Sequence, residues 1–215
     1  MEERDSGIVL RVRPLTESSL IILWLTQSGG RISTVAKGAR RPKSSFQGKL
    51  DLYYEVDITY VRSRRSTLHT LREVALKNPH SALRRELIWL HQAAYAARLI
   101  EHHTEEETPI STLFDLFTDF IRQLPSQPPS ARSILAFELK ALKILGWPPD
   151  SDQSKLARVD QDLLLSLAQL PTEHLHSIVA TPASYQNVAR YIGRFITYHL
   201  EHLPKGRPAA LGFDP

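Results

Sequence analysis

Residues 50–61 read Leu-Asp-Leu-Tyr-Tyr-Glu-Val-Asp-Ile-Thr-Tyr-Val. Apolar or aromatic side chains occupy every second position from Leu52 to Tyr60, and mostly polar residues lie between them. Successive side chains of a β-strand point to opposite faces, so this period of two predicts one long strand with a buried face. It is the clearest strand pattern in the chain.

The stretch before this strand, residues 31–49, combines a second strand pattern with a basic loop. It reads Arg-Ile-Ser-Thr-Val-Ala-Lys-Gly-Ala-Arg-Arg-Pro-Lys-Ser-Ser-Phe-Gln-Gly-Lys, in which six of 19 residues are Lys or Arg and none is acidic. Residues 31–37 alternate as a strand does. Gly38, Pro42 and Gly48 then interrupt regular structure, which predicts a loop.

Three further segments have strand character. Residues 7–13 and 20–26 are rich in β-branched and apolar side chains, and residues 27–30, Gln-Ser-Gly-Gly, are suited to a hairpin turn. After a turn at residues 62–65, residues 67–74 return as a fifth strand. Five short strands with a basic loop before the longest one predict a small closed barrel of the OB type, with an SH3-like barrel as the alternative.

From Asn78 onward the apolar period changes from two to 3.6, which predicts helices. Thr108-Pro109 and Thr181-Pro182 are typical helix starts, and Asp160 is a candidate cap for a weaker helix. The fold class is therefore α+β with two domains. We predict an OB barrel over residues 1–78, a helical partner-docking domain over 79–204 and a C-terminal tail over 205–215.

The composition is that of an ordinary globular protein, but its charge is uneven. The 215 residues carry a net charge of +4, whereas residues 1–80 alone hold 14 Lys and Arg against 8 Asp and Glu. The cationic character of the N-terminal part points to a polyanionic partner there. There is no cysteine, no signal-type segment and no apolar run long enough to span a membrane, so we expect a soluble cytoplasmic protein without disulfides.

The basic loop is the main candidate for binding nucleic acid. Lys and Arg neutralise phosphates, Ser44 and Ser45 can add hydrogen bonds, and Phe46 is a candidate base-stacking platform. Arg11 and Arg13 on the first predicted strand are weaker candidates for DNA contact than the cations of the basic loop and of the loop at residues 62–65. The predicted DNA-binding residues are Arg31, Lys37, Arg40, Arg41, Lys43, Phe46 and Lys49 with Arg62, Arg64 and Arg65 on the second loop. The alternative is that such charges only keep a surface soluble.

The remaining aromatic residues of the strands divide between core and surface. Trp24, Tyr54 and Tyr60 share apolar patterns and are predicted to lie in the core, as is Trp89. Tyr53 lies on the opposite face of the predicted long strand and is a second candidate for stacking on a base.

Several of these stretches resemble the bacterial recombination-mediator family RecO. They are residues 7–11, residues 16–26 with Gly30, residues 137–147, residues 191–203 and, most specifically, Val35-Ala-Lys-Gly-Ala-Arg-Arg-Pro-Lys-Ser44. The resemblance implies an N-terminal OB barrel, a helical domain, binding of single-stranded and double-stranded DNA, and strand annealing. It also implies partnership with RecR and with the C-terminal tail of the single-strand-binding protein SSB, during loading of RecA.

One feature departs from the family pattern. Many members hold zinc with four cysteines that begin shortly after the position of Trp147, where this chain has Asp-Ser-Asp-Gln-Ser at residues 150–154 and no cysteine. The histidine clusters at residues 102–103, 174–176 and 199–202 lack a third ligand nearby, so we predict no metal and no cofactor.

No catalytic motif is present, so we predict a protein that is not an enzyme. A pocket for the acidic, apolar SSB tail would need an apolar groove rimmed by cations, for which the candidates are Arg122, Arg132, Lys140, Lys143, Arg190 and Arg194. Two other classes stay open: an RNA-binding OB-fold protein without a repair role, and a hydrolase with a helical lid.

Overall fold

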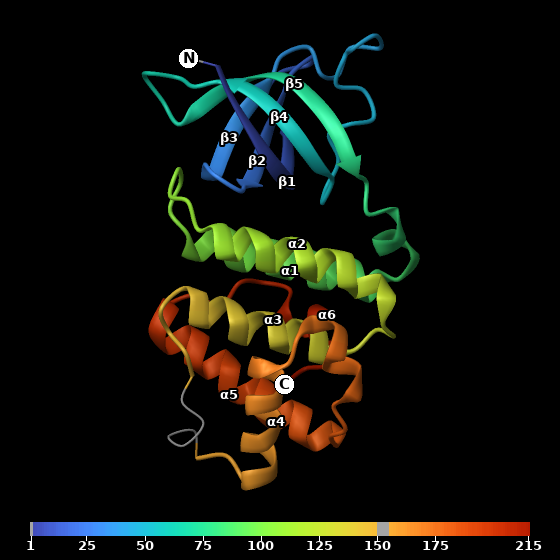
Figure 1. Cartoon of the computed structure of the whole chain (residues 1–215), viewed down its shortest axis with the longest axis vertical. Helices are drawn as coiled ribbons and strands as arrows, with labels where there is room; N and C mark the ends of the chain where they lie inside the picture. The colour runs from blue at the N-terminus through green and yellow to red at the C-terminus, as the bar shows by residue number, and fades with distance from the viewer. Residues whose placement is uncertain (1, 150–154) are drawn as a thin grey trace. The chain divides into compact units, whose positions relative to one another are not determined.

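The computed structural model describes residues 2–149 and 155–215. The chain divides into two compact units, Met1–Ser81 with Thr104–Asp115, and Ala82–His103 with Leu116–Pro215. Figure 1 shows the strands in the N-terminal part of the chain and helices in the rest. The first unit includes residues 104–115, so the two units alternate along the sequence. The predicted division at residues 78 and 204 stays a prediction.

Five strands form a closed barrel in the first unit. Their order around the barrel is β1-β2-β3-β5-β4, and all neighbours are antiparallel except β3 and β5, which pair in parallel over Ser33–Val35 and Leu68–Thr70. This closed five-stranded barrel, followed by helices, confirms the predicted OB fold. The strands are β1 Glu2–Pro14, β2 Leu20–Thr26, β3 Gly30–Ala36, β4 Glu55–Val61 and β5 Leu68–Asn78.

The first strand is longer than predicted because it serves two neighbours. Its first half pairs with β4 through Ile8, and its second half pairs with β2 from Gly7 to Pro14. A register shift between Val9 and Arg11 lets the strand bend from one partner to the other. The outer surface of the barrel thus divides along β1 into a β4 side and a β2 side.

The barrel interior is filled by alternating side chains of all five strands. Trp24 is fully buried, and its indole nitrogen donates to Thr34 Oγ1 at 2.8 Å, which satisfies the one polar atom of the ring. Tyr60 is buried and Tyr54 packs partly buried against the cluster, as predicted. The core consists of Val9, Ile22, Trp24, Ile32, Ala36, Phe46, Val56, Ile58, Tyr60, Leu71 and Val74.

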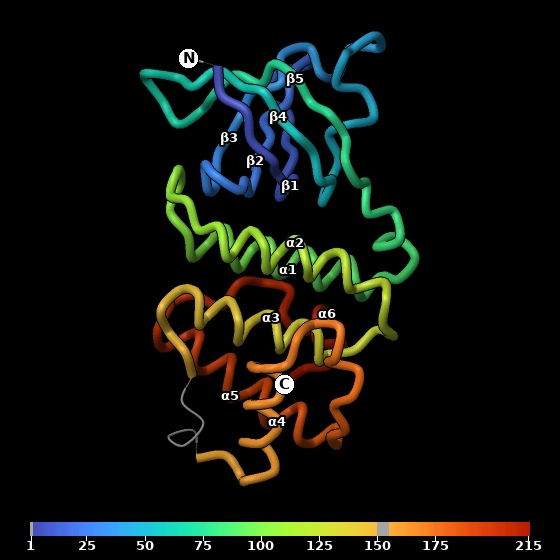
Figure 2. The backbone as a smooth tube through the Cα atoms, viewed as in Figure 1, coloured from blue at the N-terminus to red at the C-terminus, as the bar shows by residue number. Residues whose placement is uncertain are grey.

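The predicted strand over residues 50–61 begins only at Glu55. Asp51 closes a turn instead: its Oδ1 accepts from the Leu52 amide at 2.8 Å, and its carbonyl accepts from the Tyr54 amide at 3.2 Å. Tyr53 has a φ of 66°, in the left-handed region that no strand residue adopts. Local hydrogen bonding by an aspartate has overridden the period-two pattern there. Figure 2 traces this connection between β3 and β4.

Helices make up most of the C-terminal two thirds of the chain. As predicted, Thr181 caps the helix that starts at Pro182, and its Oγ1 accepts from the Ser184 amide at 3.1 Å. The predicted cap Asp160 instead lies inside α4, buried, and accepts from Asn187 Nδ2 at 2.8 Å. The helices are α1 Leu87–His103, α2 Ser111–Gln123, α3 Ala131–Ile144, α4 Arg158–Gln169, α5 Pro182–Leu200 and α6 Arg207–Leu211, with 3-10 turns η1 Ser81–Arg85, η2 Leu124–Ser126 and η3 Thr172–Ser177.

The predicted C-terminal tail contains a short packed helix, α6. Arg207 is 2% exposed and forms two hydrogen bonds with the buried carboxylate of Glu138, at 2.6 and 2.8 Å. Tyr95 donates to the same carboxylate at 2.6 Å. Burial works against the charged form of Arg207, but Glu138 raises the pKa of the guanidinium above its usual value. One buried ion pair therefore connects α6 to α3.

No helix among the described residues is both long enough and apolar enough to cross a membrane.

Candidate nucleic-acid interface

The basic loop after β3 is built from consecutive turns. The amide of Arg41 donates to Gly38, that of Ser44 to Arg41, that of Gln47 to Ser44 and that of Lys49 to Phe46, at 3.1 Å in each case. Gly38 and Gly48 adopt φ values of 69° and 71°, which glycine accepts without strain. The turns satisfy the backbone locally and leave the basic side chains outside.

The loop is attached to the barrel at two places. Phe46, 8% exposed, inserts its ring into the core cluster. At the other end, the Arg40 amide donates to the Ser18 carbonyl at 3.0 Å, and Arg40 Nη1 donates to the Thr16 carbonyl at 3.2 Å. The basic loop and the β1–β2 loop therefore form one surface, and in OB folds the β1–β2 loop borders the ligand face.

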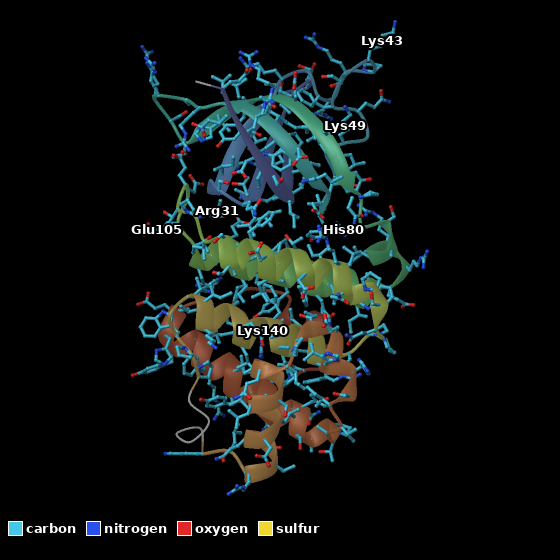
Figure 3. The ribbon with its side chains drawn as sticks, in the orientation of Figure 1. Arg31, Lys43, Lys49, His80, Glu105 and Lys140 are labelled. Atoms are coloured by element: carbon cyan, nitrogen blue, oxygen red, sulfur yellow. The ribbon has the colours of Figure 1, made fainter. Side chains whose placement is uncertain are left out.

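Four cations of this surface are exposed and have no ion-pair partner within the described part of the chain: Lys37, Arg40, Arg41 and Lys43. Figure 3 shows Lys43 extending away from the barrel. Because no ion pair among the described residues neutralises them, these charges are available to an external polyanion. Lys49, the fifth predicted cation of the loop, is half-buried and lies at the far end of the turns.

The outer face of β2 and β3 continues this surface. Cross-strand pairing aligns Arg11 with Leu23 and Ser33, and Arg13 with Ile21 and Val35. Arg11, Arg13, Ile21, Leu23 and Ser33 line a small hollow on this face. The sequence favours the loop cations over these two arginines, because a strand pattern alone does not reveal which cross-strand neighbours they meet.

Arg31, predicted as a DNA contact, is bound within the barrel unit itself. Its Nη2 donates to the Thr104 carbonyl at 2.7 Å, its Nε donates to Thr104 Oγ1 at 3.2 Å, and Nη1 lies 3.6 Å from Glu106. The Glu107 amide donates to the Arg31 carbonyl at 2.9 Å. The side chain thus holds the segment after α1 against β3, and we leave Arg31 out of the interface.

Arg62, also predicted, lies between two carboxylates. Its Nε donates to Glu3 at 2.9 Å and its Nη1 donates to Glu107 at 2.7 Å. The hydrogen bond from Tyr60 to Glu3, at 2.8 Å, is the main cause that lowers the pKa of that carboxyl. Burial and Glu3 raise the pKa of Tyr60 to about 12. Arg62 is therefore paired with Glu3 and Glu107, and we leave it out of the DNA interface as well.

The same network contains a fully buried histidine. His69 stacks on Tyr60 with ring centroids 5.4 Å apart, and its Nε2 lies 3.2 Å from Glu107. Its Nδ1 accepts from the Ser63 amide, so the neutral ring carries its proton on Nε2. Burial lowers the pKa of His69 despite the neighbouring carboxylate. The remaining cations of the second loop, Arg64 and Arg65, are exposed and form no ion pair among the described residues.

The two predicted stacking residues lie in the wrong place for that role. Phe46 belongs to the core, and Tyr53 is 5% exposed. Neither ring offers a face to a base. Within the described part of the barrel unit every aromatic side chain is at least partly buried, so this surface favours contacts to phosphate over base stacking.

Among the described residues, no three His, Asp or Glu side chains gather as a metal site. The rings of His102 and His202 lie 4.6 Å apart, but the described residues supply no third side chain to complete a metal site there. Residues 150–154, where many family members place their first cysteines, lie outside the described residues.

Comparison with known proteins agrees with this architecture. Residues 1–80 match the family described as "Recombination protein O N terminal", and residues 84–156 match "Recombination protein O C terminal". A protein of Rhodopirellula baltica called DNA repair protein RecO is 34% identical over 156 residues, which cover 73% of this chain and 58% of the relative. The protein of that name in Syntrophus aciditrophicus is 26% identical over 185 residues, which cover 84% of this chain and 71% of the relative.

The barrel and its cationic loop thus define an OB-fold protein with a surface suited to nucleic acid. The chain belongs to the RecO family. The matched part spans 58% of the Rhodopirellula relative and 71% of the Syntrophus relative.

Proposed function

We propose that this protein is a DNA-binding mediator of recombinational DNA repair that acts by binding and assembly and not as an enzyme. The observation that carries the proposal is the set of four exposed cations on the turn-built loop, Lys37, Arg40, Arg41 and Lys43, beside Arg11 and Arg13 on the β2 side of the barrel. The relatives' name, DNA repair protein RecO, supports a role in repair.

The binding mode follows from the chemistry of this surface. Lys and Arg side chains release counterions from the phosphate backbone, which gives affinity without sequence preference and a strong dependence on salt. Because the rings of Phe46 and Tyr53 are buried, base stacking contributes little. A surface that reads phosphates accepts both single-stranded and double-stranded DNA, as expected of a protein that anneals complementary strands.

The helical unit offers a pocket for a protein partner. A pocket of about 650 Å³ along α5 is lined by Gly193, Tyr198 and Leu203 with Arg190, Arg194 and Arg207 around them. Two nitrogens of Arg207 bind Glu138, while Nη1 lies beside Gly193 with no hydrogen bond among the described residues. Apolar walls with the exposed guanidinium groups of Arg190 and Arg194 suit the acidic, apolar C-terminal tail of SSB.

Two of the other predicted pocket cations, Arg132 and Lys140, are less suited to that role. Arg132 Nη1 donates to the carbonyls of His176 and Ile178, and burial lowers the pKa of Lys140. We place the SSB tail at α5, and we propose that RecR joins the SSB-bound protein and that the assembly loads RecA in the cytoplasm.

Fluorescence anisotropy with a labelled single-stranded oligonucleotide across a salt series tests the DNA role. Four to six phosphate contacts at roughly 0.7 each predict a slope of log K against log salt of about −3 to −4. Absence of binding at low salt would remove the DNA role. A second titration, with a tail peptide of SSB, compares the wild type with Arg194→Glu and tests the pocket. Charge reversal at Arg194 should abolish binding of the peptide and leave DNA binding unchanged.

The alternative is an RNA-binding OB-fold protein, for which the same loop would serve. Competition between single-stranded DNA and RNA of equal sequence separates the two, since a mediator of DNA repair should not prefer the RNA. The 2′-hydroxyl is the group through which a protein tells RNA from DNA.

A further inference from the structure

A second groove crosses the barrel on its β4 side, away from Arg11 and Arg13. It has a volume of about 960 Å³ and is floored by the first half of β1 with β4 and β5. The turn between β2 and β3 and the end of the basic loop complete its lining. Because β1 passes from β4 to β2 at its middle, this groove and the β2–β3 face are separate surfaces of one barrel.

Small side chains create the hollow. Ser6 is paired across the strands with Asp57, and Asp57 with Ala75. In the next row of this face, Thr59 lies between Arg4 and Glu73. Short side chains along the middle strand leave the floor low, while longer ones stand at the edges. The floor and walls also supply hydroxyl groups, from Ser28, Ser45 and Thr59.

Two of the three acidic residues of the groove already have partners within the protein. Asp5 accepts from the amides of Ser28 and Gly29, the latter at 2.8 Å. Asp57 accepts from Ser6 Oγ at 2.6 Å and from Lys77 Nζ at 2.9 Å, and the bond from Ser6 is the main cause that lowers its pKa. Asp57 is thus ion-paired, and Asp5 is hydrogen-bonded to the backbone.

The basic residues of the groove are not neutralised in this way. Arg4, Lys49 and Arg72 line it without an ion-pair partner among the described residues, and Asp5 and Glu73 are the lining carboxylates in the same condition there. Three unpaired cations against two anions, of which Asp5 is hydrogen-bonded to backbone amides, together with hydroxyl donors, match a phosphate backbone, for which Arg, Lys, Ser and Thr are the usual partners. Most of the exposed lining of the groove is polar.

Lys49 joins the two surfaces. It belongs to the same basic loop whose cations Arg41 and Lys43 serve the first surface, yet it lines the second groove. A strand on each side of the loop would thus be held by one barrel.

We propose that this β1–β4–β5 groove is a second nucleic-acid site, which holds the backbone of a second strand while the basic loop and the β2–β3 face hold the first. The inference rests on the proposed function. It explains how one chain can present two complementary strands to each other, since each is bound by phosphate and its bases remain open to pairing.

A stoichiometric titration tests the site. A labelled oligonucleotide of about a dozen nucleotides, at concentrations far above its Kd, should saturate the wild type at two strands per chain and Arg4→Ala/Arg72→Ala at one. The matched control, Arg85→Ala/Arg158→Ala, removes two exposed arginines outside the groove and should still bind two. Annealing of complementary strands, monitored by energy transfer between labels on the two strands, should slow at least tenfold in Arg4→Ala/Arg72→Ala and not in the control.

A gain-of-function variant guards against a folding defect. Glu73→Lys removes an exposed carboxylate that has no ion-pair partner among the described residues, and it should tighten the second binding step severalfold with the first unchanged. The second site would be overturned if Arg4→Ala/Arg72→Ala still bound two strands, or if both double variants lost the second strand equally. Either result would leave the proposed function in place. No binding of any strand by the wild type would instead remove the proposed function and this site together.

Discussion

Arg62 Nη1 lies 2.7 Å from Glu107 Oε2, across 45 positions of the sequence. Glu107 also meets the buried His69, and Arg62 also holds Glu3. With Arg31 bound to Thr104, these contacts explain why a segment between two helices belongs to the barrel unit. Two residues that the sequence marks as cations for DNA thus have a structural role.

Arg62→Ala should lower the free energy of unfolding of the barrel. Both of its ion pairs are partly exposed, so we expect about 1 kcal/mol or less in total. Urea unfolding measures the loss, and Arg64→Ala, which removes an equal charge from the same loop, serves as the control. Equal effects of the two substitutions would show that the network contributes nothing beyond net charge.

His69 makes the stability of the barrel depend on pH. Burial lowers its pKa in the folded protein, so below the unfolded pKa of about 6.5 the unfolded chain binds a proton that the folded chain does not. Stability should therefore fall as the pH drops from 6.5 toward the folded pKa. Titration of the ring signals by NMR checks the cause, and a His69 pKa at or above 6.5 would contradict it.

Arg207→Ala should be among the most damaging substitutions in the helical unit. It leaves the fully buried Glu138 without its partner, and breaking one side of a buried pair costs about 3–5 kcal/mol. The double variant Arg207→Met/Glu138→Gln should recover much of this loss, because no uncompensated charge remains. Thermal unfolding of both proteins measures the difference, and a double variant less stable than Arg207→Ala would argue against an electrostatic cause.

Phe46→Leu distinguishes a core residue from a stacking residue. Since the ring is buried in the barrel, the substitution should lower stability by about 1–2 kcal/mol and leave single-strand affinity within about twofold. Unfolding and anisotropy measurements on the same protein give both values. A large loss of DNA affinity with unchanged stability would return Phe46 to the interface.

The regular patterns of the sequence predict most of the fold. The alternating segments become the strands of the OB barrel, and Thr181-Pro182 begins a helix as expected. The strand prediction fails at residues 50–54, where Asp51 forms a turn and Tyr53 adopts a positive φ. A periodicity cannot show a side chain's hydrogen bond to its own backbone.

The site is less predictable than the fold, because charge in a sequence carries no partners. Arg31 and Arg41 look equivalent in the basic stretch, yet the first is bound to Thr104 and Glu106 from a distant segment. Phe46 looks exposed in a polar loop, but the loop folds back and inserts it into the core. Conversely, Arg4 and Arg72 share a groove only because β1 and β5 both lie beside β4.

The salt dependence of DNA binding by Arg41→Ala/Lys43→Ala tests the central claim most directly. Neither side chain makes a hydrogen bond or ion pair among the described residues, so their loss should spare the fold. If both contact phosphates, the slope of log K against log salt should become shallower by about 1.4, at roughly 0.7 per contact, whereas Arg85→Ala/Arg158→Ala should keep the wild-type slope. An unchanged slope in the loop variant would contradict the assignment of the basic loop to DNA.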